Sequence, residues 1–196
     1  MDNILKQKWQ DLHDGKAVMD RGLMIDILRE FESVETYCDY GRLEKRWLKI
    51  VQPEWVDILI DILKYPPAEM VQIYGDVWED NLESFLEEVG KATDATVTFH
   101  KIHPLLSEKS LQASVIRVIG GLDAPEGIKL LQSYVGNLDD LPQNIATAVV
   151  EALMGSQHPE IHDLLVRVKE SLPERLEFLL DEIDLHLSIY EKNHRK

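Results

Sequence analysis

The chain has 196 residues, and its 36 aspartates and glutamates outnumber its 21 lysines and arginines, which gives a formal net charge of −15 at pH 7. This length suits one domain or a short array of repeats. A negative charge of this size repels phosphate backbones and anionic lipids, so we expect neither nucleic acid nor a membrane surface as a direct partner.

The composition also predicts a cytoplasmic protein. Cys38 has no second cysteine with which to form an internal disulfide. No run approaches the about 18 apolar residues of a membrane-spanning helix, and the first residues lack the apolar core of a signal peptide.

More than half of the excess negative charge lies in residues 51–100, which hold 11 acidic and 2 basic side chains. Within that quarter, six carboxylates fall in thirteen residues that contain no lysine or arginine: Asp76, Glu79, Asp80, Glu83, Glu87 and Glu88. Such a run is either a solvated helix face or a surface that attracts a basic partner. Attraction of this kind raises association rates roughly 10- to 1000-fold.

Apolar residues recur at helical spacing through the first half of the chain, with breaks at Gly15 and at Pro66-Pro67. Pro53 stands where a helix tolerates proline, at its first turn. The predicted helices are 5–12, 22–36, 43–51, 55–63, 70–78 and 81–89.

The stretch 95–104 leaves helix, strand and loop open. Val97 and Phe99 alternate with polar residues, and β-branched residues are frequent, as in a strand. No second alternating run is present to pair with such a strand. We therefore expect an irregular or weakly helical crossover that ends at Pro104, and no significant sheet in the chain.

Helical spacing returns in the stretches 111–119, 128–135, 145–153, 161–168 and 176–190. The breaks between them contain Gly120-Gly121, Gly136, Gly155 and Pro173. We interpret the glycines as the ends of helices and the proline as the start of one.

Two segments of the second half repeat one pattern. Residues 114–135 align with 148–169 at an offset of 34, so that Gly121 meets Gly155 and Pro125 meets Pro159. Because turn residues match as well as apolar ones, the alignment indicates a true repeat of helix, tight turn and return helix. Helix pairs of this kind bury their apolar faces by stacking on their neighbours.

The turn of the first copy, VIGGLDAPE (118–126), resembles the turn of bacterial HEAT-like repeats, in which a helix end with glycine is followed by Asp/Asn-x-Pro-Glu. The second copy, ALMGSQHPE (152–160), has Gln157 where the first has Asp123. The resemblance covers about residues 110–170 and implies an all-α fold, a short α-solenoid of antiparallel helix pairs. A plain helical bundle is the alternative.

From this resemblance and the helix pattern we expect a single helical domain over residues 1–196. Its helices are less regular over 1–105, and HEAT-like repeats with a long C-terminal helix follow over 106–196.

No motif singles out residues for catalysis or metal binding. His100 and His103, and likewise His158 and His162, have the spacing of metal ligands on a helix, but the proline after His158 disfavours a helix there. Cys38 precedes an aspartate, which disfavours a reactive thiolate. We expect no metal, no cofactor and no enzymatic activity.

Trp78 lies inside the acidic run, with Tyr74 one turn earlier. An aromatic residue ringed by carboxylates suits an anchor for a cationic partner, because Trp and Tyr are frequent at the centres of interfaces. The alternative is a core tryptophan whose neighbours face water. The predicted partner-binding residues are Tyr74, Asp76, Trp78, Glu79, Asp80, Glu83 and Glu87.

These features predict a non-enzymatic module that binds another protein, a basic one. In its most specific form, the protein is an acidic immunity-type protein that neutralises a basic toxin such as a nuclease, because acidic inhibitors imitate the phosphate charge that nucleases bind. The first alternative is a general HEAT-like adaptor in a larger assembly. The second is an enzyme with an unrecognised carboxylate or histidine site.

Overall fold

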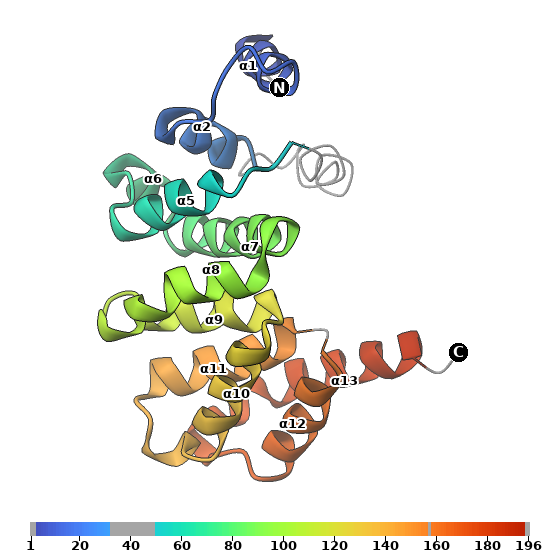
Figure 1. The fold of residues 1–196 in the computed structure, drawn as a ribbon. Helices are drawn as coiled ribbons and strands as arrows, with labels where there is room; N and C mark the ends of the chain where they lie inside the picture. Colours follow the sequence, from blue (N-terminus) through green and yellow to red (C-terminus); the bar gives the residue numbers. More distant parts are fainter. Residues whose placement is uncertain (1–2, 32–49, 157, 195–196) are drawn as a thin grey trace. The chain divides into compact units, whose positions relative to one another are not determined.

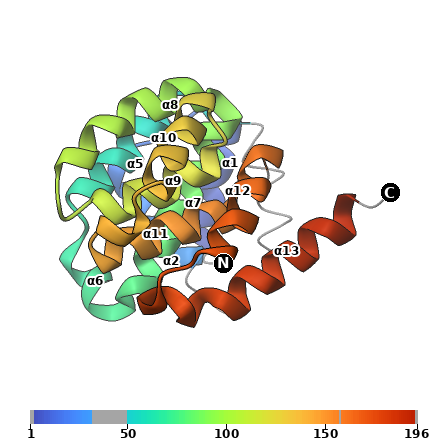
Figure 2. The ribbon, with the colours of Figure 1, turned by 90° about the horizontal axis from the view of Figure 1, so that it is seen from below.

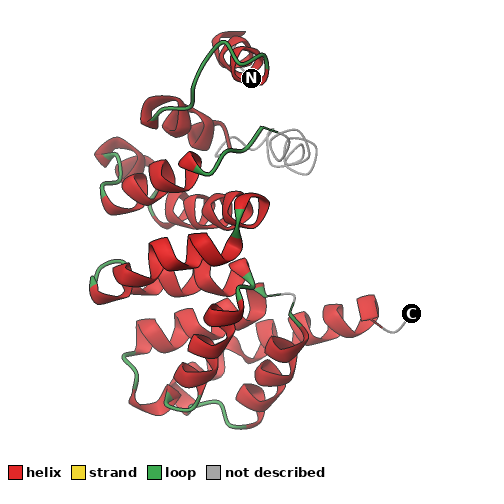
Figure 3. Cartoon of the chain, viewed as in Figure 1, coloured by secondary structure: helices red, strands yellow, loops and turns green. Residues whose placement is uncertain are grey.

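The protein is all-α in a computed structural model that describes residues 3–31, 50–156 and 158–194. These ranges contain helices, turns and loops but no strand, which confirms the predicted class (Figures 1 and 3). The contacts within the chain group it into two compact units, unit 1 (Met1–Asp94) and unit 2 (Ala95–Lys196). The subdivision expected between residues 105 and 106 falls inside unit 2.

In unit 1, helix α7 is the centre of the packing and contacts α2, α5 and α6. The described helices of this unit are α1 (Asn3–His13), α2 (Arg21–Phe31), α5 (Glu54–Lys64), α6 (Ala68–Tyr74) and α7 (Asp76–Thr93). Large side chains that are fully buried between them include Met24, Leu28, Leu59, Ile62, Met70, Leu82 and Leu86. Each buried Leu, Ile or Met contributes about 1.5–3 kcal/mol to folding.

Two arginines of α2 link it to the helices that follow. Arg21 forms an ion pair with Asp61 of α5 at 2.9 Å, and Arg29 forms one with Glu69 of α6 at 2.6 Å. These pairs are solvated, so each contributes at most about 1 kcal/mol. They nevertheless neutralise two of the carboxylates in the most acidic quarter of the chain.

Unit 2 is built from α8 (Ala95–Ile102), η1 (His103–Ser107), α9 (Gln112–Leu122), α10 (Pro125–Val135), η2 (Leu138–Asp140), α11 (Gln143–Gly155), α12 (Pro159–Glu170), η3 (Glu174–Leu179) and α13 (Leu180–His194). Helix α13 packs against α12 and η3. Its C-terminal end extends beyond the other helices of the unit (Figures 1 and 2).

The stretch left open by the sequence is a regular helix, α8, followed by the 3-10 turn η1. Thr98, Phe99 and Ile102 are its buried residues, and their spacing is helical. The helix packs against η1, α9 and α10. Tertiary packing therefore overrides the strand preference of the β-branched residues.

The two predicted repeats are two helix pairs, α9–α10 and α11–α12. Pro125 and Pro159 each occupy the first turn of the second helix of a pair, as predicted. Helix α11 packs against α9, α10 and α12, and α10 packs against α12. Arg117 of α9 and Glu151 of α11 are 34 residues apart, which is the offset of the two repeats, and the Arg117 side chain donates a hydrogen bond to the Glu151 carboxylate at 2.6 Å.

The glycines of the first repeat do not end a helix, which corrects the prediction. Gly120 and Gly121 lie inside α9, which ends at Leu122, and the residue that adopts the left-handed conformation after it is Asp123, with φ of 54°. Aspartate is among the few residues that tolerate this conformation.

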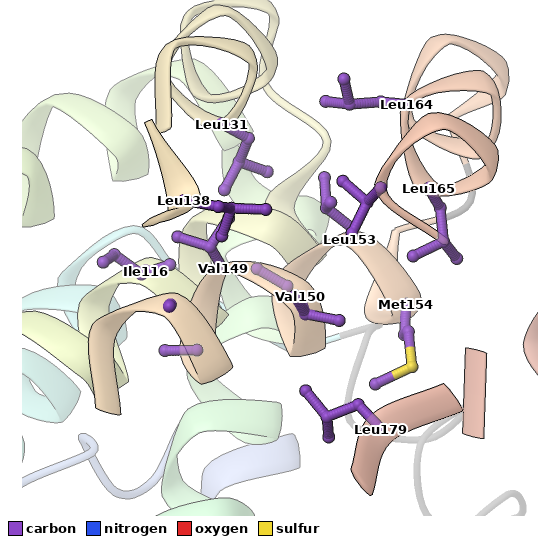
Figure 4. Close-up of a cluster of buried hydrophobic side chains, with 14 of the residues drawn as sticks. Ile116, Leu131, Leu138, Val149, Val150, Leu153, Met154, Leu164, Leu165 and Leu179 are labelled. Atoms are coloured by element: carbon purple, nitrogen blue, oxygen red, sulfur yellow. The ribbon is translucent and has the colours of Figure 1, made fainter. Parts of the chain in front are cut away.

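The core of unit 2 lies among the two repeats and the helices that follow them. Side chains from α10, η2, α11 and α12 point into the space between these elements, and Ile116 of α9 and Leu179 of η3 also belong to the cluster (Figure 4). Ala148, Val149 and Val150 of α11 are each fully buried, as expected for a helix that contacts neighbours on several sides.

Leu43 and Trp47 of the predicted helix 43–51, and Cys38, lie outside the described residues. Within the described ranges, none of the helices has both the length and the hydropathy that crossing a bilayer requires.

Candidate functional site

Two of the predicted partner-binding residues, Trp78 and Glu83, are buried in unit 1. Their exposed fractions are 2% and 4%. The indole Nε1 of Trp78 is buried and has no hydrogen-bond partner among the described residues. Trp78 is therefore a core residue, and this placement corrects the expectation of a surface anchor. Glu83, likewise, is not positioned to meet a partner.

The remaining acidic residues of α7 lie nearer to solvent. Asp80 is exposed, and Glu79 and Glu87 are half-buried. Each of these three takes part in an interaction with another residue of the chain. The side chains of Tyr74 and Asp76 lie outside the described part of the structure.

Four large apolar side chains near α6 are exposed instead, and we call them the α6–α7 surface. Tyr65, Val71, Ile73 and Val77 are 64%, 47%, 68% and 56% exposed. Single exposed apolar side chains are common. Four within thirteen residues are a local concentration along the chain, and exposed apolar side chains that gather on a surface mark interaction sites.

Gly75 breaks the helix within this surface. Its φ of 54° and ψ of −131° interrupt the helix that the sequence predicted over 70–78 and divide it into α6 and α7. Such a conformation favours glycine, because side chains rarely adopt it. The apolar stripe consequently does not continue across the break: Met70 and Trp78 turn inward, and Val71, Ile73 and Val77 remain outside.

A second feature, in unit 2, is a pocket of about 40 Å³ between α11, α12 and α13. Its polar wall consists of Ser156, His162, His186 and Tyr190. Its apolar wall consists of Leu153, Met154, Leu165, Leu187 and Ile189. We call it the α12–α13 pocket.

His162 is the centre of this pocket. Its ring stacks on that of Tyr190, with centroids 4.0 Å apart and planes inclined by 21°. Its Nδ1 lies 3.7 Å from the Asp163 carboxylate. Its Nε2 is buried and has no hydrogen-bond partner among the described residues. The sequence spacing suggests His158 as the neighbour of the His162 ring, whereas in the structure the ring stacks on Tyr190 of α13.

Ser156 and His158 shape the turn that enters α12. The Ser156 hydroxyl donates to the Asp123 carboxylate and accepts the backbone N–H of His158 at 3.2 Å. The side chain of His158 accepts the backbone N–H of Glu160 at 3.3 Å and so caps the helix. His158 is therefore an N-terminal turn residue, as its position before a proline predicts.

His100 and His103 flank Phe99, with ring centroids 5.5 and 5.2 Å from it, and both are exposed. Among the described residues, no group of three or more His, Cys, Asp or Glu side chains is placed to hold a metal ion. We take the α6–α7 surface and the α12–α13 pocket, both formed by described residues, as candidates for recognition.

Comparison with known proteins does not assign a family, because no family model, curated protein or solved structure matches the chain.

Proposed function

We propose that the protein is a non-enzymatic module that binds a basic protein through the α6–α7 surface. The observation that carries this proposal is the exposure of Tyr65, Val71, Ile73 and Val77 in a quarter of the chain that holds 11 acidic and 2 basic residues. Apolar contacts hold the partner once it is docked, and the negative charge steers a positively charged partner toward them.

The partner that we propose in the most specific case is a basic toxin such as a nuclease, with this protein as its immunity protein. The net charge of −15 supports this choice, because an acidic chain can imitate the phosphate charge that a nuclease binds. A general adaptor would use the same surface for a partner that is not a toxin.

We also propose that the helix pairs of unit 2 form a short HEAT-like solenoid. The equivalent turns support it, and so does the bond between Arg117 and Glu151, which are 34 residues apart. A crystal structure in which one rotation superposes α9–α10 on α11–α12 in a common direction would support the solenoid. Two pairs that face each other around a central core would contradict it.

The toxin proposal is tested by co-expressing the protein with the toxin encoded beside its gene, and by measuring cell survival and complex formation. We expect the variant Ile73→Asp to bind the partner at least about 10-fold more weakly, since an interface centre loses more than 1.4 kcal/mol on such a change. Phe178→Asp is the matched control, because Phe178 is a similarly exposed apolar residue, at 61%, in unit 2.

Ile73 is exposed, so Ile73→Asp should leave the circular dichroism spectrum and the thermal midpoint of the free protein unchanged. If Ile73→Asp and Phe178→Asp bind the partner with equal affinity, the α6–α7 surface is not part of the interface. A toxin that neither binds the protein nor is neutralised by it would contradict the immunity function. The general adaptor would then be the remaining proposal.

A further inference from the structure

We propose that a second copy of this chain covers one side of helix α13, so that two α13 helices form an antiparallel pair. The side in question, which we call the α13 face, consists of Glu182, Leu185, Ile189 and Lys192. These residues belong to unit 2 and are different from those of the α6–α7 surface. The pairing therefore goes beyond the proposed function and is tested separately from it.

Helix α13 carries apolar residues on two opposite sides. Ile183 is fully buried and Leu187 is half-buried, on the side from which α13 packs against α12 and η3. On the other side, Leu185 and Ile189 are 58% and 46% exposed. A surface helix ordinarily has polar residues on the side away from its core. The exposed apolar pair is therefore suited to contact with another molecule.

The four residues of the α13 face follow one another at intervals of three, four and three residues. Residues at these intervals share one side of a helix, and all four are exposed. Their order along the helix is an acid, two apolar residues and a base. At a rise of about 1.5 Å per residue, Glu182 and Lys192 lie about 15 Å apart along the helix. They are thus too far apart to pair with each other within one copy.

This order is self-complementary when a second α13 runs in the opposite direction. A two-fold axis midway between Leu185 and Ile189 places Leu185 of each copy opposite Ile189 of the other. Because Glu182 comes three residues before Leu185 and Lys192 three residues after Ile189, the same axis places each Glu182 opposite Lys192 of the other copy. A two-fold dimer presents one such patch on both copies.

Charge selects the antiparallel direction. In a parallel pair, Glu182 would meet Glu182 of the other copy and Lys192 would meet Lys192, and like charges in these positions repel each other. The antiparallel pair converts both repulsions into attractions. The C-terminal end of α13 extends beyond the other helices of unit 2 (Figures 1 and 2), which leaves it open to a second helix on this side.

The contact is small, and we expect the dimer to be weak. Stable dimers bury about 1,200–2,000 Å² in total, and a single pair of helices that meet over about three turns buries less. The net charge of −15 on each copy also opposes association. The expected dissociation constant is on the order of 0.1 mM.

Sedimentation equilibrium of the full chain under reducing conditions, from about 10 µM to about 1 mM, measures this association. We expect a reversible equilibrium between monomer and dimer. Leu185→Asp should weaken the dimer at least about 10-fold, because it places a charge at the centre of the contact. Since Leu185 is exposed, the thermal midpoint of the monomer should not change. Ile73→Asp is the matched control in unit 1 and should leave the dimer intact.

Charge reversal tests the direction of the helices. Glu182→Lys and Lys192→Glu each place like charges opposite one another at two positions of the dimer, so each should weaken it at least about 5-fold. The double variant restores opposite charges with exchanged roles and should recover the affinity of the wild type. Asp140→Lys is the control, because it changes the net charge as Glu182→Lys does, at an exposed residue outside α13.

The sign of the effect separates local pairing from net charge. Both Glu182→Lys and Asp140→Lys make the chain less negative, so an effect of net charge alone would strengthen both dimers. The proposal requires that Glu182→Lys weaken the dimer while Asp140→Lys does not. A dimer that Glu182→Lys strengthens, or that Leu185→Asp leaves intact, would overturn it.

A chain that stays monomeric at about 1 mM would also overturn the proposal. If such a chain loses affinity for the basic partner through Leu185→Asp, the α13 face belongs to the interface with that partner. Affinity for the partner is measured with less than about 1 µM of this protein, where the expected dimer is dissociated. Absence of the dimer therefore leaves the proposed function intact, and absence of a basic partner leaves the dimer intact.

Discussion

Gly120 of α9 lies at a close approach to α11 in unit 2. A Cβ atom at this position would lie 2.4 Å from the carbonyl oxygen of Ala152 and 2.6 Å from its Cβ. These distances are well inside van der Waals contact, and the carbonyl belongs to the backbone of α11, which yields less readily than a side chain. Close packing therefore requires a glycine here, although glycine in a helix interior costs about 0.5–1 kcal/mol.

We expect Gly120→Ala to lower the free energy of unfolding by about 2–3 kcal/mol, because α9 and α11 must separate to accommodate the methyl group. Urea denaturation measures the change. Gly136→Ala is the matched control: its nearest neighbour would be 3.7 Å away and its φ is −62°, so that variant should be as stable as the wild type or slightly more stable. Equal stability of the two variants would contradict the close approach.

Burial is what the sequence predicts least well at this scale. The acidic run on α7 is visible in the sequence, but the sequence does not show that Glu83 lies inside and Asp80 outside. Helix α7 is covered by α2, α5 and α6, so its buried face is wider than a simple amphipathic stripe. Glu83 lies beside the apolar positions of this wide face, so its side chain is buried together with theirs.

At the scale of elements, Arg175 joins two connections that are distant in sequence. Its guanidinium group donates to the backbone carbonyl oxygens of Leu141 at 2.7 Å, Leu138 at 2.6 Å and Asp139 at 3.1 Å. These carbonyls belong to η2 and the turn before α11, whereas Arg175 is in η3. One planar side chain thus supplies the donors for a turn that would otherwise depend on water.

We expect Arg175→Met to lower the free energy of unfolding by about 2 kcal/mol, because it leaves half-buried carbonyls without a charged donor while keeping most of the apolar stem. Arg167→Met is the control, since Arg167 is exposed and its side chain donates to the Asp163 backbone carbonyl within its own helix at 3.4 Å. Thermal unfolding compares the two. A larger loss for Arg167→Met would refute the role of Arg175.

Prolines at helix starts were reliable signals, whereas the glycines near the end of α9 and the elements defined by packing were not. Pro125 and Pro159 placed the starts of α10 and α12 correctly. Helix α8 was ambiguous because its β-branched residues favour a strand until neighbouring helices are present. The candidate sites were harder still. Gly75 ends one apolar stripe and starts another, and His162 meets Tyr190 from a different helix, so neither arrangement follows from spacing along one helix.

At the scale of the whole molecule, the net charge of −15 destabilises the folded state and strengthens binding to a basic partner. Like charges repel one another in the compact state, and salt screens this repulsion. Attraction between an acidic protein and a basic partner is screened by the same ions. Salt should therefore strengthen the fold and weaken the complex.

We expect a rise in sodium chloride from about 0.05 M to about 0.5 M to raise the thermal midpoint of the free protein, because the Debye length shortens from more than 10 Å to roughly 4 Å. Over the same range the proposed complex should weaken at least about 10-fold, mainly through a slower association rate. Calorimetry and surface plasmon resonance measure the two effects. A complex that is insensitive to salt would show that apolar contact alone holds the partner.

The offset of 34 residues between the helix pairs also determines how this protein can change its length. Arg117 and Glu151 occupy equivalent positions in neighbouring pairs, and Ser156 of one turn bonds to Asp123 of the other. If the pairs stack as proposed, an added copy of residues 123–156 would repeat the bond between Ser156 and Asp123, whereas Glu151 would face the glutamate of the copy and not an arginine. An insertion of any other length within the helices would shift these residues away from their partners.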